Sequence, residues 1–257
     1  MSNLDQIKEL REQTGAGMME VKKALEEAGN DKEKATEVLK KSGALKAQKK
    51  SDRATSEGLV DIKISPDHKK ASIIQINCET DFVAKNEIFI NLVSELSSKN
   101  LETNDAETEF NSRKEDLVLK IGENLTFGRA EVLEAEYISG YLHSNKKVGS
   151  LISFSAQIEE ELAHDIAMHI TALNPGYLKP EDVPVDILEK EKEVYREQLK
   201  NQGKPEEIIE KILQGKLAKF YEENCLLNQP FVKDDKKKVK ELLPKGVEIV
   251  KFVRYSL

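Results

Sequence analysis

The stretch that organises this sequence is residues 78–86, Cys-Glu-Thr-Asp-Phe-Val-Ala-Lys-Asn. It separates an apolar run typical of a β-strand, residues 71–77, from a helical pattern, which makes it a strand-to-helix corner. Thr80 and Asp81 are residue types that cap helix starts, because their side-chain oxygens accept hydrogen bonds from free backbone N–H groups. Phe82 falls in the first helical turn, where side chains usually face solvent. We interpret the corner as an apolar wedge aimed at another molecule, and not as a phosphate site, because Asp81 itself fills the electropositive helix start.

Residues 1–43 carry the pattern of three short helices that form a small bundle. Apolar residues recur at helical spacing, and the turn Thr-Gly-Ala-Gly at residues 14–17 separates the first two helices. Ser42-Gly43 is expected to end the third helix. Residues 44–56 are polar, basic and without a period, which predicts a linker to the rest of the chain.

Residues 57–257 carry one order of elements twice. In residues 57–135 two β-rich runs form a hairpin, helices follow and a strand closes the unit, with residues 100–111 expected to be a loose polar connection. The same order recurs in residues 136–257, which lack the Thr-Asp-Phe corner. We therefore predict an α+β fold with a duplicated core of two small antiparallel sheets, each with helices on one face.

Residues 186–222 are expected to form an insertion in the second unit. Two helical runs with apolar faces, residues 187–199 and 206–221, are separated by Asn-Gln-Gly-Lys-Pro at 201–205. Folded back on each other, they would form an αα-hairpin that projects from the core. Two ordinary surface helices are the alternative interpretation, which differs only in how far the pair stands off the core.

Composition argues against several classes of protein. The net charge of −7 disfavours a nucleic-acid-binding protein, and no apolar run approaches the roughly 18 to 20 residues that span a bilayer. The start of the chain resembles neither a secretory signal nor a transit peptide, so a cytoplasmic location is expected. Cys78 and Cys225 are distant single cysteines, which suggest neither a disulfide framework nor a zinc site and are expected to be small core or surface residues.

The sequence carries no recognisable catalytic or cofactor-binding motif. Gly15-Ala16-Gly17 resembles the start of a dinucleotide fingerprint, but no strand precedes it and Glu20 stands in the position of the last glycine. His164 and His169 are five residues apart and therefore on different faces of a helix, which favours ordinary helix histidines over metal ligands. We therefore expect neither a metal, nor a cofactor, nor a conventional active site.

Two long signatures remain, and both closely resemble one family. They are residues 11–25, Arg-Glu-Gln-Thr-Gly-Ala-Gly-Met-Met-Glu-Val-Lys-Lys-Ala-Leu, and residues 78–86. Shorter matches lie at residues 121–124 (Ile-Gly-Glu-Asn), 204–208 (Lys-Pro-Glu-Glu-Ile) and 229–232 (Gln-Pro-Phe-Val). The family they resemble is elongation factor Ts, and the likeness covers nearly the whole chain.

The resemblance implies a guanine nucleotide exchange factor of protein biosynthesis, which is not an enzyme and uses no cofactor. Such a factor binds elongation factor Tu in its GDP-bound and nucleotide-free forms, disturbs the Mg²⁺ and phosphate site and promotes GDP release so that GTP can rebind. The N-terminal module of residues 1–43 resembles a ubiquitin-associated fold. Self-association through residues 136–257 is left open, and no nucleic acid or membrane is implied as a partner.

The resemblance also implies which residues contact elongation factor Tu. Asp81 and Phe82 correspond to a pair that intrudes between helices of Tu, within a segment linked to displacing the Mg²⁺ ion. That segment is Thr80, Asp81, Phe82 and Val83. The other expected contacts are Arg11, Met18, Met19 and Lys22 in the N-terminal module, and Ile121, Gly122 and His143 in the core.

Alternatives remain open at two levels. His143 can equally be a turn-facing histidine of the second hairpin, and Met18, like Leu10, can belong to the core of the helix bundle. Adjacent Met18 and Met19 lie on different faces of their helix, so one of them is expected to face a partner. The rival function is a helical adaptor that binds a protein or peptide through its N-terminal module without exchange activity, and an enzyme assembled from distant residues is a remoter third.

Overall fold

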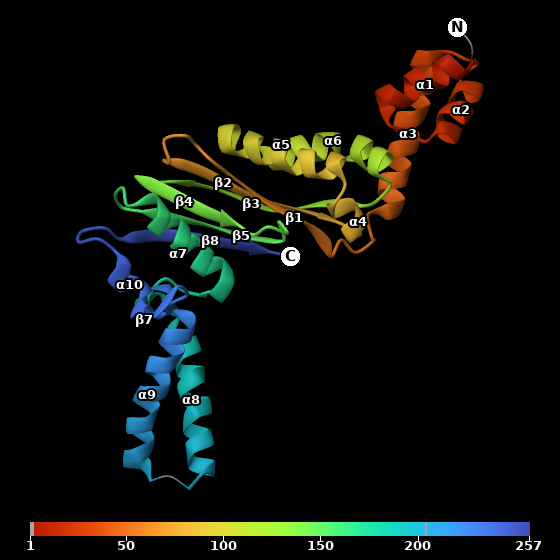
Figure 1. Ribbon diagram of the computed structural model, residues 1–257. Helices are drawn as coiled ribbons and strands as arrows, with labels where there is room; N and C mark the ends of the chain where they lie inside the picture. Colours follow the sequence, from red (N-terminus) through yellow and green to blue (C-terminus); the bar gives the residue numbers. More distant parts are fainter. Residues whose placement is uncertain (1–2, 204) are drawn as a thin grey trace.

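The computed structural model describes residues 3–203 and 205–257, so that Lys204 of the matched 204–208 motif lies outside the described residues. A helical module, a central core and a projecting pair of helices follow one another in space (Figure 1). The fold is α+β with small antiparallel sheets, as the sequence predicts.

Three helices form the N-terminal module: α1 (Asn3–Thr14), α2 (Met18–Glu27) and α3 (Lys32–Lys50). Asp31 caps α3 by accepting hydrogen bonds from the backbone N–H groups of Glu33 and Lys34. The buried core of the module consists of Ile7, Leu10, Ala16, Val21, Ala24, Leu25, Ala35 and Leu39, together with Leu119 from a helix of the central core. The module is therefore packed on the core and not merely tethered to it.

The expected end of the third helix at Ser42-Gly43 is wrong, because α3 continues to Lys50 through the first half of the expected linker. Gly43 lies where α3 passes close to α6 (Ala106–Ile121). A Cβ atom at Gly43 would lie 3.4 Å from the carbonyl oxygen of Glu115 and 3.5 Å from the Cβ atom of Leu119. This glycine permits close helix packing and does not end a helix.

The first unit of the core is a three-stranded antiparallel sheet in the order β1 (Glu57–Ile64), β2 (Lys70–Cys78), β3 (Leu125–Glu134). The short helix α4 (Asp81–Ala84), α5 (Glu87–Thr103) and α6 lie between β2 and β3 in the chain. The prediction of a loose connection at residues 100–111 is wrong, since only Asn104 and Asp105 separate α5 from α6. Asn104 adopts a left-handed conformation that ends α5.

The second unit repeats this design in the order β4 (Tyr137–Leu142), β5 (Val148–Phe154), β8 (Ile249–Ser256), with α7 (Glu160–Leu173) after β5. Between α7 and β8 the chain adds elements that have no counterpart in the first unit. They are the projecting helices α8 (Val185–Asn201) and α9 (Glu206–Asn224), the small hairpin β6 (Pro230–Phe231) and β7 (Asp234–Lys238), and the short helix α10 (Val239–Leu242).

The two sheets pack face to face, with the helices on the outside (Figure 1). The residues between the sheets are Val60, Ala71, Ile73, Leu133, Ile138, Leu151, Val253 and Tyr255. Alternate residues of β2, such as Ile74 and Ile76, face α5 on the other side. Because β2 is covered on both faces, positions 71–76 are all buried, the polar Ser72 and Gln75 included.

The edge strands β3 and β8 of the two sheets are joined by polar contacts. Lys251 Nζ lies 2.6 Å from Glu131 Oε1, and the guanidinium carbon of Arg129 lies 4.1 Å from the centre of the Tyr255 ring. On the opposite edge, the N–H of Val60 in β1 donates to the carbonyl oxygen of Lys146 in the β4–β5 turn.

Helices α8 and α9 pack against each other and point away from the core (Figure 1). Leu199, Ile209 and Leu213 are buried between them, and Val183, Phe220 and Cys225 form the cluster at their base. Within the described ranges, 3–203 and 205–257, no helix combines the length and apolar character needed to cross a membrane.

Candidate functional site

The corner at residues 78–86 forms as expected, with Thr80 as the residue that caps α4. Its backbone is extended and its Oγ1 atom accepts a hydrogen bond from the N–H of Val83 at 3.4 Å. Val83 and Ala84 face the core of the first unit. Phe82 points the other way and is 81% exposed. Of the large hydrophobic side chains in the described ranges, it is the most exposed.

The carboxylate of Asp81 is held on the surface by a lysine one helical turn further on. Lys85 Nζ donates to Asp81 Oδ2 at 2.7 Å. This hydrogen bond and the positive charges of Lys85 and Lys147 lower the pKa of Asp81. Asp81 is therefore ionised at neutral pH, and as the first residue of α4 it also lies favourably at the positive end of the helix.

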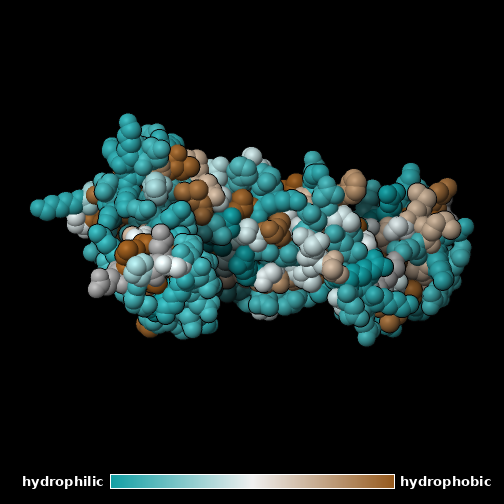
Figure 2. All heavy atoms as spheres, turned by 90° about the horizontal axis from the view of Figure 1, so that it is seen from below, coloured by the Kyte–Doolittle hydropathy of each residue, from teal (hydrophilic) through white to brown (hydrophobic). Residues whose placement is uncertain are grey.

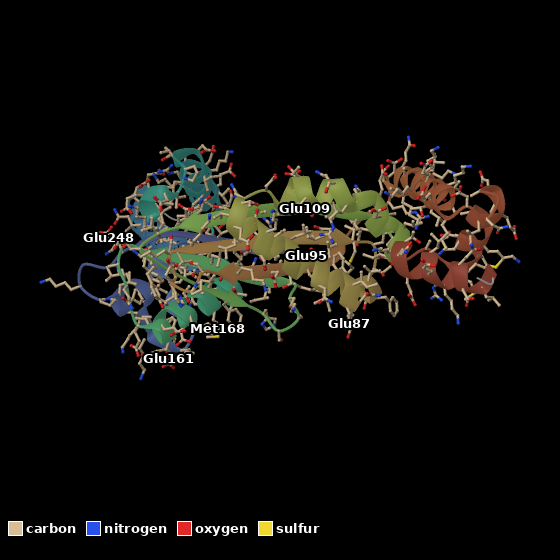
Figure 3. All side chains as sticks on the ribbon, turned by 90° about the horizontal axis from the view of Figure 1, so that it is seen from above. Glu87, Glu95, Glu109, Glu161, Met168 and Glu248 are labelled. Atoms are coloured by element: carbon tan, nitrogen blue, oxygen red, sulfur yellow. The ribbon has the colours of Figure 1, made fainter. Side chains whose placement is uncertain are left out.

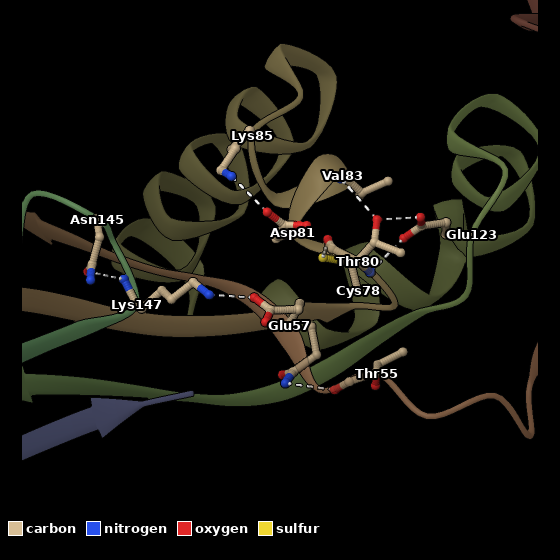
Figure 4. Close-up of polar contacts among 11 residues, drawn as sticks. Thr55, Glu57, Cys78, Thr80, Asp81, Val83, Lys85, Glu123, Asn145 and Lys147 are labelled. Atoms are coloured by element: carbon tan, nitrogen blue, oxygen red, sulfur yellow. Dashed lines mark hydrogen bonds and ion pairs between the residues drawn. The ribbon is translucent and has the colours of Figure 1, made fainter.

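Hydrogen bonds between two pairs of residues, Thr80 with Glu123 and Glu79 with Asn124, join the corner to the loop that follows α6. Figure 4 shows the first pair. Glu123 accepts from the hydroxyl of Thr80 at 2.6 Å and from its backbone N–H at 3.0 Å. Glu79 in turn accepts from the backbone N–H of Asn124 at 2.6 Å. We refer to Glu79, Thr80, Glu123 and Asn124 as the clasp.

Ile121 and Gly122 lie directly beside the clasp. Ile121 is the last residue of α6 and is partly buried against the core of the first unit. Gly122 ends the helix in a left-handed conformation, with φ of 85°, and its N–H donates to the carbonyl oxygen of Val118. Lys50, the last residue of α3, donates to the carbonyl oxygen of Gly122.

His143 lies in the turn between β4 and β5 and is exposed. Its Nδ1 atom lies 3.2 Å from the hydroxyl of Tyr141. The same turn is tied to the start of β1, because Lys147 Nζ donates to Glu57 Oε2 at 2.5 Å, close to Asp81 (Figure 4). The structure thus brings this turn, the corner and residues 121–122 to one end of the core, and the exposed turn fits both interpretations of His143.

The four expected contacts in the N-terminal module lie apart from this cluster. Arg11 is in the last turn of α1, Met18 and Met19 open α2, and Lys22 forms a loose ion pair with Glu26 at 3.9 Å. Both methionines are exposed, Met19 to 74%. The assignment of Met18 to the bundle core is therefore wrong, whereas Leu10 is buried there.

The outer faces of the helices over the first sheet are polar. Glu95 on α5 and Glu109 on α6 both pair with Arg113, and these acidic residues lie along the side seen in Figure 3. The opposite side is mainly hydrophilic, with separate hydrophobic spots at its two ends and between them (Figure 2). Among the exposed large hydrophobic side chains of the described residues, Phe82 is the one aromatic ring.

Of the other histidines and cysteines named from the sequence, His169 and both cysteines are buried, whereas His164 is exposed. His169 is fully buried, its Nε2 atom lies 2.9 Å from Gln229 Oε1, and its Nδ1 atom accepts from the N–H of Val232. His164 is exposed on the same helix, with its ring against Tyr141. Cys78 and Cys225 are free and buried, and burial raises the pKa of the two thiols to about 12 and about 11. In the described ranges no group of three or more His, Cys, Asp or Glu residues is suited to hold a metal ion.

Sequence reasoning missed the clasp and the Asp81–Lys85 pair as parts of the site. Lys85 could have been found, because a spacing of four residues places two side chains on one helix face. Glu123 lies 43 positions from Thr80 in sequence, and nothing local links the two. The only signal for Glu123 was its place in the matched Ile-Gly-Glu-Asn motif.

Comparison with known proteins identifies the family. A family model described as "Elongation factor TS" matches residues 79–257. A relative named "Elongation factor Ts" from Nitratiruptor sp. is 43% identical over 279 aligned residues, which cover 98% of this chain and 92% of the relative. A relative of the same name from Aquifex aeolicus is 41% identical, and the alignment covers 99% of this chain and 97% of the relative. Another from Clostridium botulinum is 39% identical, with 100% of this chain and 93% of the relative covered. The chain belongs to the elongation factor Ts family.

Proposed function

We propose that the chain acts in the cytoplasm as the guanine nucleotide exchange factor of elongation factor Tu and performs no covalent chemistry. The observation that carries this proposal is the exposure of Phe82 on a corner that is otherwise firmly anchored, in a member of the elongation factor Ts family. A large apolar ring held in solvent by buried neighbours has no role in the stability of its own chain. Its place is explained if a partner covers it.

The proposed mechanism is linkage between two binding equilibria. Free energy that the factor gains only with the nucleotide-free or distorted form of Tu weakens nucleotide and Mg²⁺ binding by the same amount. Each 1.4 kcal/mol or so of this difference corresponds to a tenfold change in affinity. Burial of the Phe82 ring against Tu would supply roughly 1.5 to 3 kcal/mol of it.

The other site residues extend this contact. Asp81 carries a negative charge beside the wedge and would compete for the surroundings of the Mg²⁺ ion of Tu. Gly122 and the exposed His143 flank the corner on the same end of the core. Met18 and Met19, with Arg11 and Lys22, form a separate docking surface on the N-terminal module.

The test is the rate at which Tu releases a fluorescent GDP with and without this protein. We expect acceleration by the wild type and a loss of about tenfold or more for Phe82→Ala, from the transfer free energy of the ring. Val250→Ala, which also removes an exposed apolar side chain but on β8, is the matched control and should leave the rate unchanged. An undiminished rate for Phe82→Ala would refute the wedge.

The adaptor is retained as a second candidate because both Met18 and Met19 are exposed. Deleting residues 1–56 would not discriminate cleanly, since Leu119 of α6 is part of the module core and would become exposed. A Met18→Ala, Met19→Ala double variant is the better probe. An adaptor would lose its binding of Tu altogether, whereas an exchange factor keeps weak binding and some exchange through the corner.

The finer architectural assignments are also proposals. They are a ubiquitin-associated-like module formed by α1, α2 and α3, core subdomains at 57–135 and 136–257, and an αα-hairpin inserted in the second. Self-association through residues 136–257 belongs with them. The masses of the free protein and of its complex with Tu, measured in solution, test the last of these directly.

A further inference from the structure

The direction of Phe82 depends on contacts outside its own helix. Helix α4 is a single turn of four residues, which has no stability of its own in water. Val83 and Ala84 anchor one side of α4 in the core. The rotation of α4 about its axis, and the path of the chain that enters it, then depend on the cap residue Thr80. The cap bond from Val83 to Thr80 is long, at 3.4 Å, and therefore weak.

Glu123 supplies the stronger bonds at this position. Its carboxylate oxygens accept from both the hydroxyl and the N–H of Thr80, at 2.6 and 3.0 Å. Hydrogen bonds to an ionised carboxylate are roughly twice as strong as neutral ones. Donation to Glu123 also fixes the Thr80 hydroxyl so that its lone pair faces the N–H of Val83, which ties the cap to the carboxylate.

Glu123 is itself held in place by its neighbours. The following residue, Asn124, is fully buried and donates its backbone N–H to Glu79. Its side-chain amide donates to the carbonyl oxygens of Arg53 at 2.9 Å and Ser51 at 3.3 Å. Arg53 Nη1 in turn lies 3.3 Å from Glu79 Oε2. The clasp is thus a closed set of contacts and not a single bond.

Residues 119–124, which include Glu123, also contact the N-terminal module. Leu119 is part of the module core, and Lys50 at the end of α3 donates to the carbonyl oxygen of Gly122. The turn between α1 and α2 also lies against α6, because a Cβ atom on Gly15 would meet the side chain of Lys120. Residues 119–124 therefore contact the module at one end and the corner at the other.

We propose that Glu123 is a positioning residue for nucleotide exchange: through Thr80 it holds α4 so that Phe82 projects in one direction, at a fixed distance from the N-terminal module. This inference rests on the proposed function. Glu123 does not itself enter the contact with Tu, and its effect on exchange passes through the Phe82 ring.

A double-mutant cycle tests this directly, with GDP release from Tu as the readout. In the wild-type background Glu123→Ala is expected to slow stimulated release by about tenfold, and Glu123→Gln by less, because the amide keeps one acceptor. In the Phe82→Ala background the same substitutions should change the rate by less than about twofold, since there is no ring left to position. Thr80→Val, which removes the hydroxyl, should slow release as Glu123→Ala does. Thr80→Ser, which keeps the hydroxyl, should slow release less than Thr80→Val.

Controls separate positioning from loss of fold. Glu95→Gln removes an exposed carboxylate that pairs with Arg113 on the outer face of α5, and it should leave the rate unchanged in both backgrounds. All rates are compared at equal concentrations of folded protein, determined from thermal unfolding. If Glu123→Ala does not fold, Glu123→Gln and Thr80→Val complete the cycle.

The outcomes are distinct. An equal loss in both backgrounds, or no loss for Glu123→Ala in the wild-type background, overturns the positioning role while the proposed function stands. A wild-type protein that fails to accelerate release, or a Phe82→Ala variant at the wild-type rate, overturns the proposed function instead. A rate loss confined to proteins that keep Phe82 supports the inference.

Discussion

Gly43 offers a test of how the N-terminal module is joined to the core, because two substitutions there should have opposite effects. An alanine Cβ would lie 3.4 Å from the carbonyl oxygen of Glu115 and 3.5 Å from the Cβ of Leu119, which is ordinary contact. Replacing a helical glycine by alanine then stabilises the protein by about 0.5 to 1 kcal/mol.

Leucine at Gly43 has no such room. Its further carbon atoms would have to enter the space that α6 already fills, and overpacking of this kind costs about 1 to 3 kcal/mol. For a chain of this size each kcal/mol shifts the melting temperature by about 2 to 4 °C. We also expect Gly43→Leu to slow stimulated GDP release, since it moves α3 away from α6 and changes the spacing between the module and Phe82.

Thermal and urea unfolding of the two variants, beside GDP release, is the assay. Gly215 on α9 is the matched control, because none of the described residues lies within 4 Å of a Cβ atom there. Both alanine and leucine should therefore stabilise that helix. A Gly43→Leu variant as stable as Gly215→Leu would refute the close approach of α3 to α6. A strongly destabilised Gly43→Ala would contradict the 3.4 Å separation between that Cβ atom and the carbonyl oxygen of Glu115.

Three further predictions concern the core. Burial lowers the pKa of His169 below its ordinary value, so the unfolded chain binds the proton more tightly than the folded protein does. The free energy of unfolding should therefore fall as pH drops below about 6.5. Urea titrations at pH 7 and pH 5.5 should show a smaller fall for His169→Gln than for the wild type. Gly58→Ala should cost about 2 to 4 kcal/mol, because its Cβ would lie 2.2 Å from the carbonyl oxygen of Ile76 at a φ of 154°. Gly140→Ala should cost less, because its Cβ would lie 3.1 Å from the carbonyl oxygen of Ser150 and its closest contact, at 2.8 Å, is the end of the Leu151 side chain. Equal melting temperatures for the two variants would be evidence against this. Because burial raises the pKa of the Cys78 thiol to about 12, iodoacetamide at pH 8 should leave Cys78 intact in the folded protein and modify it in urea, and rapid labelling of the folded form would show that the corner opens.

The duplicated core could be predicted from sequence because each unit is specified by local patterns. Period-two apolar runs, turn residues and helix caps lie within a few residues of one another, so the hairpins and the cap at Thr80 are readable in the chain. The matched motifs added the expected partner surface. Phe82 was singled out correctly as exposed for the same local reason, its place in the first turn of a helix.

The remaining features depend on contacts between distant residues. Gly43 was taken for a helix end because the signal for a break is the same as the signal for close packing, and only the position of α6 decides between them. The partnership of Thr80 and Glu123 spans 43 positions. That the two sheets face each other could not be predicted either, because Ser72, Gln75 and Asn77 interrupt the apolar residues of β2 and hide its burial on both faces.

The joined edges of the two sheets limit how copies of this chain can associate. Three-stranded sheets expose two edges each, and such edges invite strands from other molecules to add on, which leads to aggregation. Here Lys251 and Glu131 link β3 to β8, and the backbone of the β4–β5 turn occupies an N–H of β1. Charged side chains along an edge oppose the docking of a foreign strand. At these three edges a strand from another copy would therefore meet charged side chains or an occupied backbone group, which disfavours association by strand addition there.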